Sequence, residues 1–219
     1  MTSPTSGSAS FFNQYRLIIL LIVAVVVSRL PIISIPFNWL ESYFHELSHG
    51  LAAIVSGGSI IKIELFTNGA GLCTTLGGDR FLISFMGYLG AILWGGAIYK
   101  MALARQSWLK FFAQALLVIL ALSVIFWVRD ILTFFIVLLL MVLFYLKIKL
   151  NNQYVAILLQ LTGILVLLNA ILSPLHLLDG HHLGDGAALA SLTGIPEIFW
   201  VIIWSVLGVS VLYKLGKSK

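Results

Sequence analysis

The chain has 219 residues, of which 60% are hydrophobic and only 10% are charged, and its mean hydropathy is +1.06. Because a soluble domain carries roughly a quarter of charged residues, this composition excludes a soluble globule and indicates a polytopic membrane protein. The net charge of +5 does not indicate nucleic-acid binding, since the basic residues stand singly or in pairs at the ends of apolar segments, as membrane flanks do.

The first segment, residues 1–15, is small and polar, and no basic region precedes the first apolar run. This pattern predicts a disordered tail rather than a signal peptide, followed by a single integral-membrane domain over 16–219. The apolar run at 17–28 is too short to span alone. We expect it to continue past Arg29 and Pro31 as a kinked helix.

A second helix is predicted from a capping-box spacing, in which Asn38 is followed three residues later by Glu41. The helix is expected to begin at about Trp39 and to end at the pair Gly57 and Gly58, which supplies a left-handed cap. Its length of about 18 residues suits membrane depth. Glu41 is assigned to the cap rather than to a metal.

A β-hairpin is predicted over 59–80, because apolar and polar residues alternate there and Asn68-Gly69 is typical of a tight turn. Further apolar spans follow at roughly 82–99, 109–128, 131–146, 154–172 and 197–213. The predicted fold is an all-α polytopic membrane protein with six or seven transmembrane helices and one short β-hairpin.

The basic flanks predict an orientation. If all seven segments cross, Lys100, Arg105, Lys110, Lys147, Lys149, Lys214, Lys217 and Lys219 lie on one side, and Arg16, Lys62, Arg80 and Arg129 on the other. The side with eight basic residues is predicted to be cytoplasmic, because cytoplasmic loops carry the excess of Lys and Arg.

All five histidines fall in two short segments of a chain that otherwise avoids polar side chains. Ionisable groups at membrane depth are expensive and are therefore functional candidates. His45 and His49, four residues apart on a helix, point about 40° apart and can bind one ion, with Glu46 beside them to act on a water. The structural alternative is that these residues belong to a polar stripe of the helix that only packs against a partner helix. The single cysteine excludes a cysteine-built zinc cluster.

A catalytic zinc site needs a third protein ligand and one open position. The second histidine segment, 173–186, offers Asp179 and Asp185, and the residues alone leave the choice between them open. Either acid has a purely structural alternative, an Asp-Gly turn at Asp179 and a helix N-cap at Asp185. His181 and His182 are candidates to orient the ligands or to donate to an oxyanion.

With these motifs the chain resembles the site-2 protease family of intramembrane zinc metalloproteases, peptidase family M-fifty. Its first motif, His-Glu-x-x-His on a membrane helix, is matched at residues 45–49, and its second, Leu-Asp-Gly, at 178–180 after Pro174. The resemblance implies that Asp179 completes the zinc site, with Asp185 as the alternative third ligand. It departs at Asn169, which stands further from the proline than the family's Asn.

More of the chain resembles the small, PDZ-less, B-like branch of that family. The Gly-Tyr-Leu-Gly run at 87–90, the Trp-Gly-Gly run at 94–96 and the segment 184–196 carry this likeness, which covers most of 38–210. That branch often marks its acidic motif by the Asp equivalent to Asp185.

The resemblance implies a zinc metalloendopeptidase, with one Zn²⁺ per chain and Glu46 as the catalytic base. It would hydrolyse peptide bonds in or beside transmembrane segments of membrane proteins, as in regulated intramembrane proteolysis. Its partners are then a membrane-protein substrate and the lipid bilayer, with no nucleic acid, in a multi-pass protein of the plasma membrane. The hairpin is expected to be either a structural plug or an edge for an extended substrate.

The alternative is a non-proteolytic metal-binding membrane protein: a scaffold, a chaperone or a metal transporter. A transporter is expected to carry acids and histidines on several spans along a path. The spans at 109–128, 131–146 and 197–213 have almost none beyond their ends, which favours one fixed site.

Overall fold

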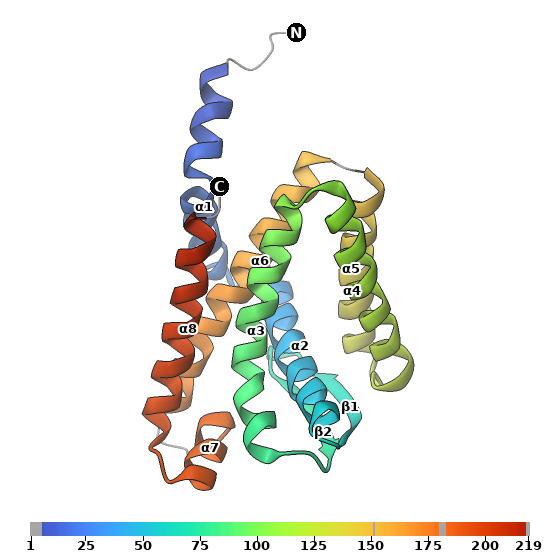
Figure 1. Ribbon diagram of the computed structural model, residues 1–219, viewed down its shortest axis with the longest axis vertical. Coiled ribbons are helices and arrows are strands. Elements are labelled where there is room, and N and C mark those ends of the chain that lie inside the picture. Colours follow the sequence, from blue (N-terminus) through green and yellow to red (C-terminus); the bar gives the residue numbers. More distant parts are fainter. Residues whose placement is uncertain (1–5, 151, 180–182, 218–219) are drawn as a thin grey trace.

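The computed structural model describes residues 6–150, 152–179 and 183–217, and shows a helical bundle with one hairpin at its edge (Figure 1). The elements are α1 (Ser6–Ser28), α2 (Pro31–Val55), β1 (Ser59–Leu65), β2 (Gly71–Leu76), α3 (Arg80–Leu103), α4 (Gln106–Phe126), α5 (Ile131–Leu150), α6 (Gln153–Leu172), the 3-10 helix η1 (Ser173–Asp179), α7 (Asp185–Thr193) and α8 (Glu197–Lys217). The all-α polytopic architecture is confirmed.

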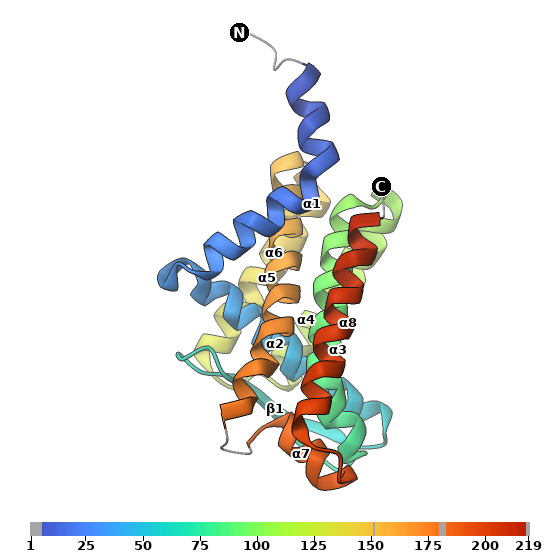
Figure 2. The same cartoon turned by 90° about the vertical axis from the view of Figure 1, so that its left-hand side faces the viewer.

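Within the described residues, five helices are long and apolar enough to cross a membrane: α3, α4, α5, α6 and α8. Helices α1 and α2 form a bent pair, with 107° between them, which raises the count to six if the pair is one span. Figure 2 shows this bend where α1 ends and α2 turns back toward the hairpin. The count of seven is not reached, because the pair counts as at most one crossing.

The start of α2 corrects one prediction. The helix begins at Pro31, about two turns before the predicted start, because proline at the first helical position loses no hydrogen bond. Leu30 before it is extended, and its carbonyl accepts the backbone N–H of Ser34 at 2.9 Å. Asn38 and Glu41 therefore lie inside the helix, and their assignment to a capping box is wrong.

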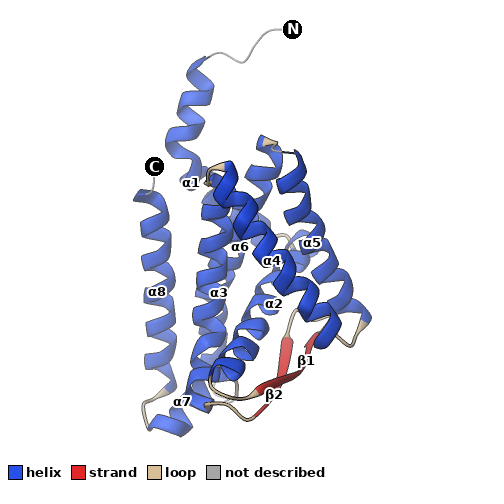
Figure 3. Ribbon diagram, turned by 45° about the vertical axis from the view of Figure 1, so that its right-hand side comes forward, coloured by secondary structure: helices blue, strands red, loops and turns tan. Residues whose placement is uncertain are grey.

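The end of α2 and the hairpin agree with the predictions. The helix ends at Val55 and Gly57 has φ +87°, in the left-handed region. The strands β1 and β2 pair antiparallel, from Ser59 with Leu76 to Leu65 with Gly71. Figure 3 shows the hairpin beside α2 and the end of α4.

The position of α1 corrects a second prediction. The guanidinium of Arg16 lies within electrostatic range of Lys147 and Tyr99, and Leu17 contacts the position of Gly216 near the end of α8. Arg16 was placed on the opposite side from Lys147, which is wrong, because that prediction counted α1 and α2 as two crossings. The helix α1 also begins at Ser6, inside the segment assigned to a tail.

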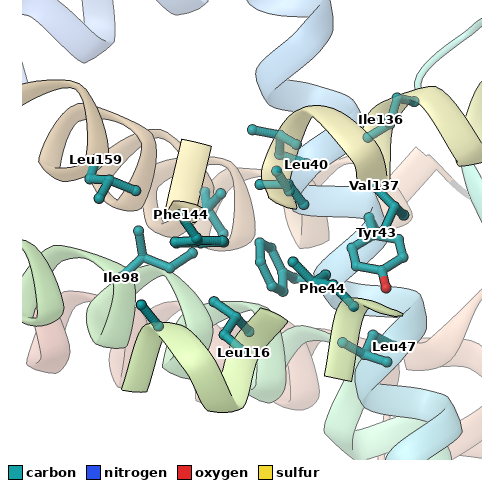
Figure 4. Packing of buried hydrophobic residues seen from close by; sticks show 14 of the residues in the cluster. Leu40, Tyr43, Phe44, Leu47, Ile98, Leu116, Ile136, Val137, Phe144 and Leu159 are labelled. Atoms are coloured by element: carbon teal, nitrogen blue, oxygen red, sulfur yellow. The ribbon is translucent and has the colours of Figure 1, made fainter. Parts of the chain in front are cut away.

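Two faces of α2 have different environments. The apolar face packs into a core made by α3, α4, α5 and α6 (Figure 4). This core contains Leu40, Tyr43, Phe44, Leu47, Ile98, Leu116, Val137, Phe144 and Leu159. The spacing 40, 43, 44 and 47 is that of one helical stripe. The opposite face of α2, which carries the histidines, is thereby held against the other half of the bundle.

The helices α3 and α6 approach at backbone distance. A Cβ atom added to Gly163 would lie 2.7 Å from the carbonyl oxygen of Gly95 and 2.7 Å from the nitrogen of Tyr99. Small residues permit such close packing between membrane helices. This pair forms a rigid wall beside the histidine face of α2.

Candidate metal centre

The two histidines of α2 lie on one face of the helix, as their spacing predicts. The Nε2 atoms of His45 and His49 are 2.9 Å apart, and the two rings meet edge to face with their centroids 4.6 Å apart. Both imidazoles therefore direct their Nε2 atoms at one point.

Asp185 brings a carboxylate to the same point. Its Oδ2 lies 3.0 Å from Nε2 of His45 and 3.3 Å from Nε2 of His49. The three donor atoms lie within 4.8 Å of one another. Because the ligand atoms of a tetrahedral zinc stand about 3.3 Å apart, this set fits one ion with a fourth position left for water or substrate.

The electrostatics of Asp185 suit a metal ligand. Burial alone would raise the pKa of this carboxyl, but His49 and His45 hold the pKa well below its usual range. The group is therefore ionised at neutral pH, which is the form that binds a cation.

A glycine on each side of Asp185 fixes its place. Gly184 has φ +90° and ψ −167°, a conformation that residues with a Cβ rarely adopt. Gly186 lies against Glu197, the first residue of α8, where an added Cβ would stand 2.7 Å from Cγ. The turn at Gly184 therefore starts α7 with the Asp185 carboxylate facing α2.

The structure describes the side chains of only some of the other predicted site residues. Asp179 ends η1, and its side chain lies outside the described part of the structure, as do His181 and His182. Of the two acids considered as third ligand, Asp185 is the one whose described carboxylate joins the imidazoles. His176 is exposed and lines the same cavity as His45 and His49.

Helix α3 supports both imidazoles. Nδ1 of His49 donates to the carbonyl oxygen of Ile83 at 2.7 Å, which leaves the Nε2 lone pair free for a metal. The ring of Tyr88 stands edge-on to His45, with centroids 4.4 Å apart. A Cβ at Gly87 would lie 2.6 Å from Nε2 of His49 and 2.7 Å from Cε1 of His45, so this position has no room for a side chain.

Glu46 lies beside the two histidines and is 8% exposed. The backbone of β2 passes directly against it, since a Cβ at Gly71 would stand 2.8 Å from Oε1 of Glu46. Glu46 and both histidines line one cavity. The carboxylate is therefore held between the hairpin and the two histidines.

The cavity has a volume of about 1430 Å³ and is walled by α1, α2, the hairpin, α3, α6 and the segment before α7. Asn38 and Glu41 line it, and Nδ2 of Asn169 donates to Oδ1 of Asn38 at 2.9 Å. The sequence analysis missed Asn38 and Glu41 as cavity residues. The available signal was their spacing of seven and four residues before His45, about two turns and one turn, which places them on its helical face.

The hairpin has one closed edge and one open edge. On β1, the N–H of Ile63 donates to the carbonyl of Trp127 at 2.9 Å, and the N–H of Leu65 donates to Oγ1 of Thr133 at 2.8 Å. The described sheet has only two strands, so the outer edge of β2 carries no third strand. Gly71 and Cys73 of β2 line the cavity.

Side chains of α2 hold the tip of the hairpin. Nε1 of Trp39 donates to the carbonyl of Phe66 at 2.8 Å, and Oγ of Ser42 donates to the carbonyl of Gly69 at 2.5 Å. The hairpin therefore lies along the same helix that carries the histidines.

Comparison with known proteins agrees with this geometry. The model of the Peptidase M50B-like family matches residues 17–215, nearly the whole chain. No curated protein and no solved structure matches it. Since the match includes every helix that builds the cavity, the chain belongs to the Peptidase M50B-like family, within the site-2 proteases.

Proposed function

We propose that this protein is a zinc-dependent intramembrane endopeptidase that cleaves peptide bonds in or beside transmembrane segments of other membrane proteins. The observation that carries the proposal is the convergence of His45, His49 and Asp185 beside Glu46, inside a bundle of membrane-length helices. Membership of the Peptidase M50B-like family supports the same function.

We infer that Asp185, rather than Asp179, is the third zinc ligand. The Oδ2 atom of Asp185 already lies at ligand–ligand distance from both imidazole nitrogens. Two histidines and one carboxylate, with a glutamate as base, form a donor set that suits zinc.

The chemistry follows from the residues around this set. Bound zinc would act as a Lewis acid on the scissile carbonyl and would acidify the attacking water. The carboxylate of Glu46 takes the proton from that water and returns it to the leaving amide nitrogen. The burial of Glu46 against Gly71 keeps this carboxylate aimed at the cavity.

The hairpin supplies a place for the substrate backbone. A helical peptide bond hides its carbonyl in the helix hydrogen bonds, so a transmembrane substrate must unwind before cleavage. We propose that the unwound segment adds as a strand to the outer edge of β2, because contacts with Trp127 and Thr133 already occupy the edge of β1.

The test is metal content by mass spectrometry, together with cleavage of a transmembrane reporter, for purified wild type and three alanine variants. We expect about one zinc per chain in wild type and in Asp179→Ala, and loss of zinc and cleavage in His49→Ala and Asp185→Ala. Loss of zinc in Asp179→Ala with retention in Asp185→Ala would refute Asp185 as the ligand. Zinc-loaded wild type that cleaves no membrane substrate would favour the scaffold instead.

A further inference from the structure

Glu41 is a carboxylate of the cavity wall that the proposed mechanism does not use. It lies on α2 one turn before His45, lines the cavity and is 6% exposed. Within the described part of the chain, no hydrogen bond or ion pair joins it to another residue. A buried carboxylate without a partner is costly, above all in a membrane protein, and therefore indicates a functional group.

The polar side chains around Glu41 already have partners. Oδ1 of Asn38 accepts from Nδ2 of Asn169 at 2.9 Å, and Oγ of Ser42 donates to the carbonyl of Gly69. The Nε2 atom of His45 faces Asp185 instead of Glu41. The Glu41 carboxylate therefore remains available to a group that enters the cavity.

The cavity wall supplies little positive charge for this carboxylate. Among the described residues that line the cavity, Arg29 is the one Lys or Arg. It is exposed at the end of α1, and no ion pair joins it to Glu41. The chemical complement of an unpaired, buried carboxylate is a Lys or Arg side chain, which can make a charge-assisted hydrogen bond to it.

The hairpin gives a scale for the distance between Glu41 and the reacting bond. Helix α2 and the second half of the hairpin contact each other in matched steps, at Ser42 with Gly69, at Glu46 with Gly71 and at Gly50 with Cys73. Each step is four residues of helix, about 6 Å, and two residues of extended chain, about 6.6 Å. The hairpin segment therefore runs alongside the helix in the same direction.

A substrate strand on the outer edge of β2 would run along α2 in the same steps. Glu41 stands about 6 Å before His45 and about 12 Å before His49 along the helix axis. A bond held between the two histidines is therefore about two or three extended residues from Glu41. Since side chains alternate between the faces of a strand, one of these two positions directs its side chain at α2.

We propose that Glu41 is a specificity-determining residue that binds a Lys or Arg side chain of the substrate, about two or three residues from the scissile bond. This inference rests on the proposed function and deepens it by naming the substrate class: membrane proteins with a basic residue close to the cleaved bond. Such residues are frequent where a transmembrane helix meets the headgroup region.

Selectivity is measured with single-span reporters that differ at one position. A lysine, a methionine or a glutamate stands at the second or third residue on either side of the scissile bond, which mass spectrometry of the products locates. We expect the best lysine reporter to have a kcat/KM about 10–100-fold above that of its methionine counterpart, as a buried hydrogen bond between charged groups predicts. The preferred side gives the direction of the substrate strand.

Three variants of Glu41 test the assignment. Glu41→Gln keeps the size of the side chain and should abolish the lysine preference while zinc content stays at the wild-type level. Glu41→Asp should keep a weaker preference, and Glu41→Lys should shift the preference to the glutamate reporter. A lysine preference that survives in Glu41→Gln overturns the proposal. Loss of zinc in Glu41→Gln also overturns it, because Glu41 would then act on the metal site.

The matched control is Glu64→Gln. This is the same chemical change on β1, at a residue that does not line the cavity. We expect Glu64→Gln to retain the lysine preference of wild type. An equal loss of preference in Glu64→Gln and Glu41→Gln would assign the effect to net charge and overturn the proposal.

Binding without cleavage separates this inference from the proposed function. In a Glu46→Gln background, fluorescence anisotropy in detergent measures the affinity for labelled peptides of the lysine and methionine reporters. We expect the lysine peptide to bind about tenfold more tightly, and the double variant with Glu41→Gln to lose this difference. Equal binding of both peptides overturns the proposal. Preferential binding of lysine, with no cleavage by wild type, supports the proposal and counts against the proposed function alone.

Discussion

The helices α2, α3 and α6 differ from the α4–α5 pair in how closely they approach one another. On α3, Gly87 and Gly95 contact imidazoles and backbone atoms of neighbouring helices, whereas α4 and α5 contain no glycine. The α4–α5 pair packs through large side chains such as Leu116 and Phe144. The packing of α2, α3 and α6 is therefore fixed by close contacts, where one added methyl group forces a shift, while the α4–α5 pair can adjust by repacking.

The largest effect is expected among these three helices, at Glu46, the proposed base. Glu46→Gln keeps the size of the side chain but removes the base, so cleavage should fall by about 10²–10⁴-fold while zinc content stays at the wild-type level. Cleavage rates of the transmembrane reporter test the predicted loss of activity, and zinc measured on the same samples tests the predicted retention of the metal. An active Glu46→Gln protein would contradict the mechanism.

One added methyl group at Gly87 tests whether α2, α3 and α6 tolerate added volume less well than the α4–α5 pair. We expect Gly87→Ala to displace both imidazoles and to lose most of the bound zinc, because its Cβ would lie within 2.7 Å of each ring. The control is Ala121→Val, in the apolar groove of about 430 Å³ between α4 and α5. Zinc content equal to wild type in both variants would show that the two regions do not differ.

A smaller effect is expected where α3 and α6 meet. Gly163→Ala should lower the free energy of unfolding by about 2–3 kcal/mol, because the methyl group meets backbone rather than a flexible side chain. Thermal melting in detergent measures it, with Leu158→Ala on the exposed side of α6 as the control. A melting temperature of Gly163→Ala above that of the control would contradict close packing as the source of rigidity.

The smallest effect lies where the α4–α5 pair supports the hairpin. Thr133 is fully buried and accepts the N–H of Leu65, so Thr133→Val should lower the free energy of unfolding by about 1 kcal/mol. Zinc content should not change, because neither Leu65 nor Thr133 lines the cavity of the candidate metal centre. Thr133→Ser retains the hydroxyl and should restore the wild-type melting temperature; failure to do so would assign the effect to packing.

Local patterns were sufficient to predict most elements and part of the site. The apolar runs predicted the five long helices, and the spacing of His45 and His49 predicted their shared face, because helical period is a short-range property. The start of α2 was missed, since the sequence analysis favoured the Asn38 cap over proline at the first helical position.

These local patterns did not predict contacts between residues that are far apart in the sequence. Asp185 joins the histidines through the turn at Gly184 and the packing of α7 on α3 and α8, neither of which leaves a periodic signal. The roles of Gly71 and Gly87 likewise depend on which helix or strand lies opposite them.

The placement of the donors on two distant segments has a consequence for stability. His45 and His49 belong to α2, whereas Asp185 belongs to α7, so an ion bound to all three would cross-link segments from the two ends of the chain. Such a link favours the native state by a free energy that grows with the logarithm of the binding affinity. Chelation should therefore lower the melting temperature of wild type and leave that of His49→Ala unchanged, so the metal would hold the bundle together as well as serve the reaction.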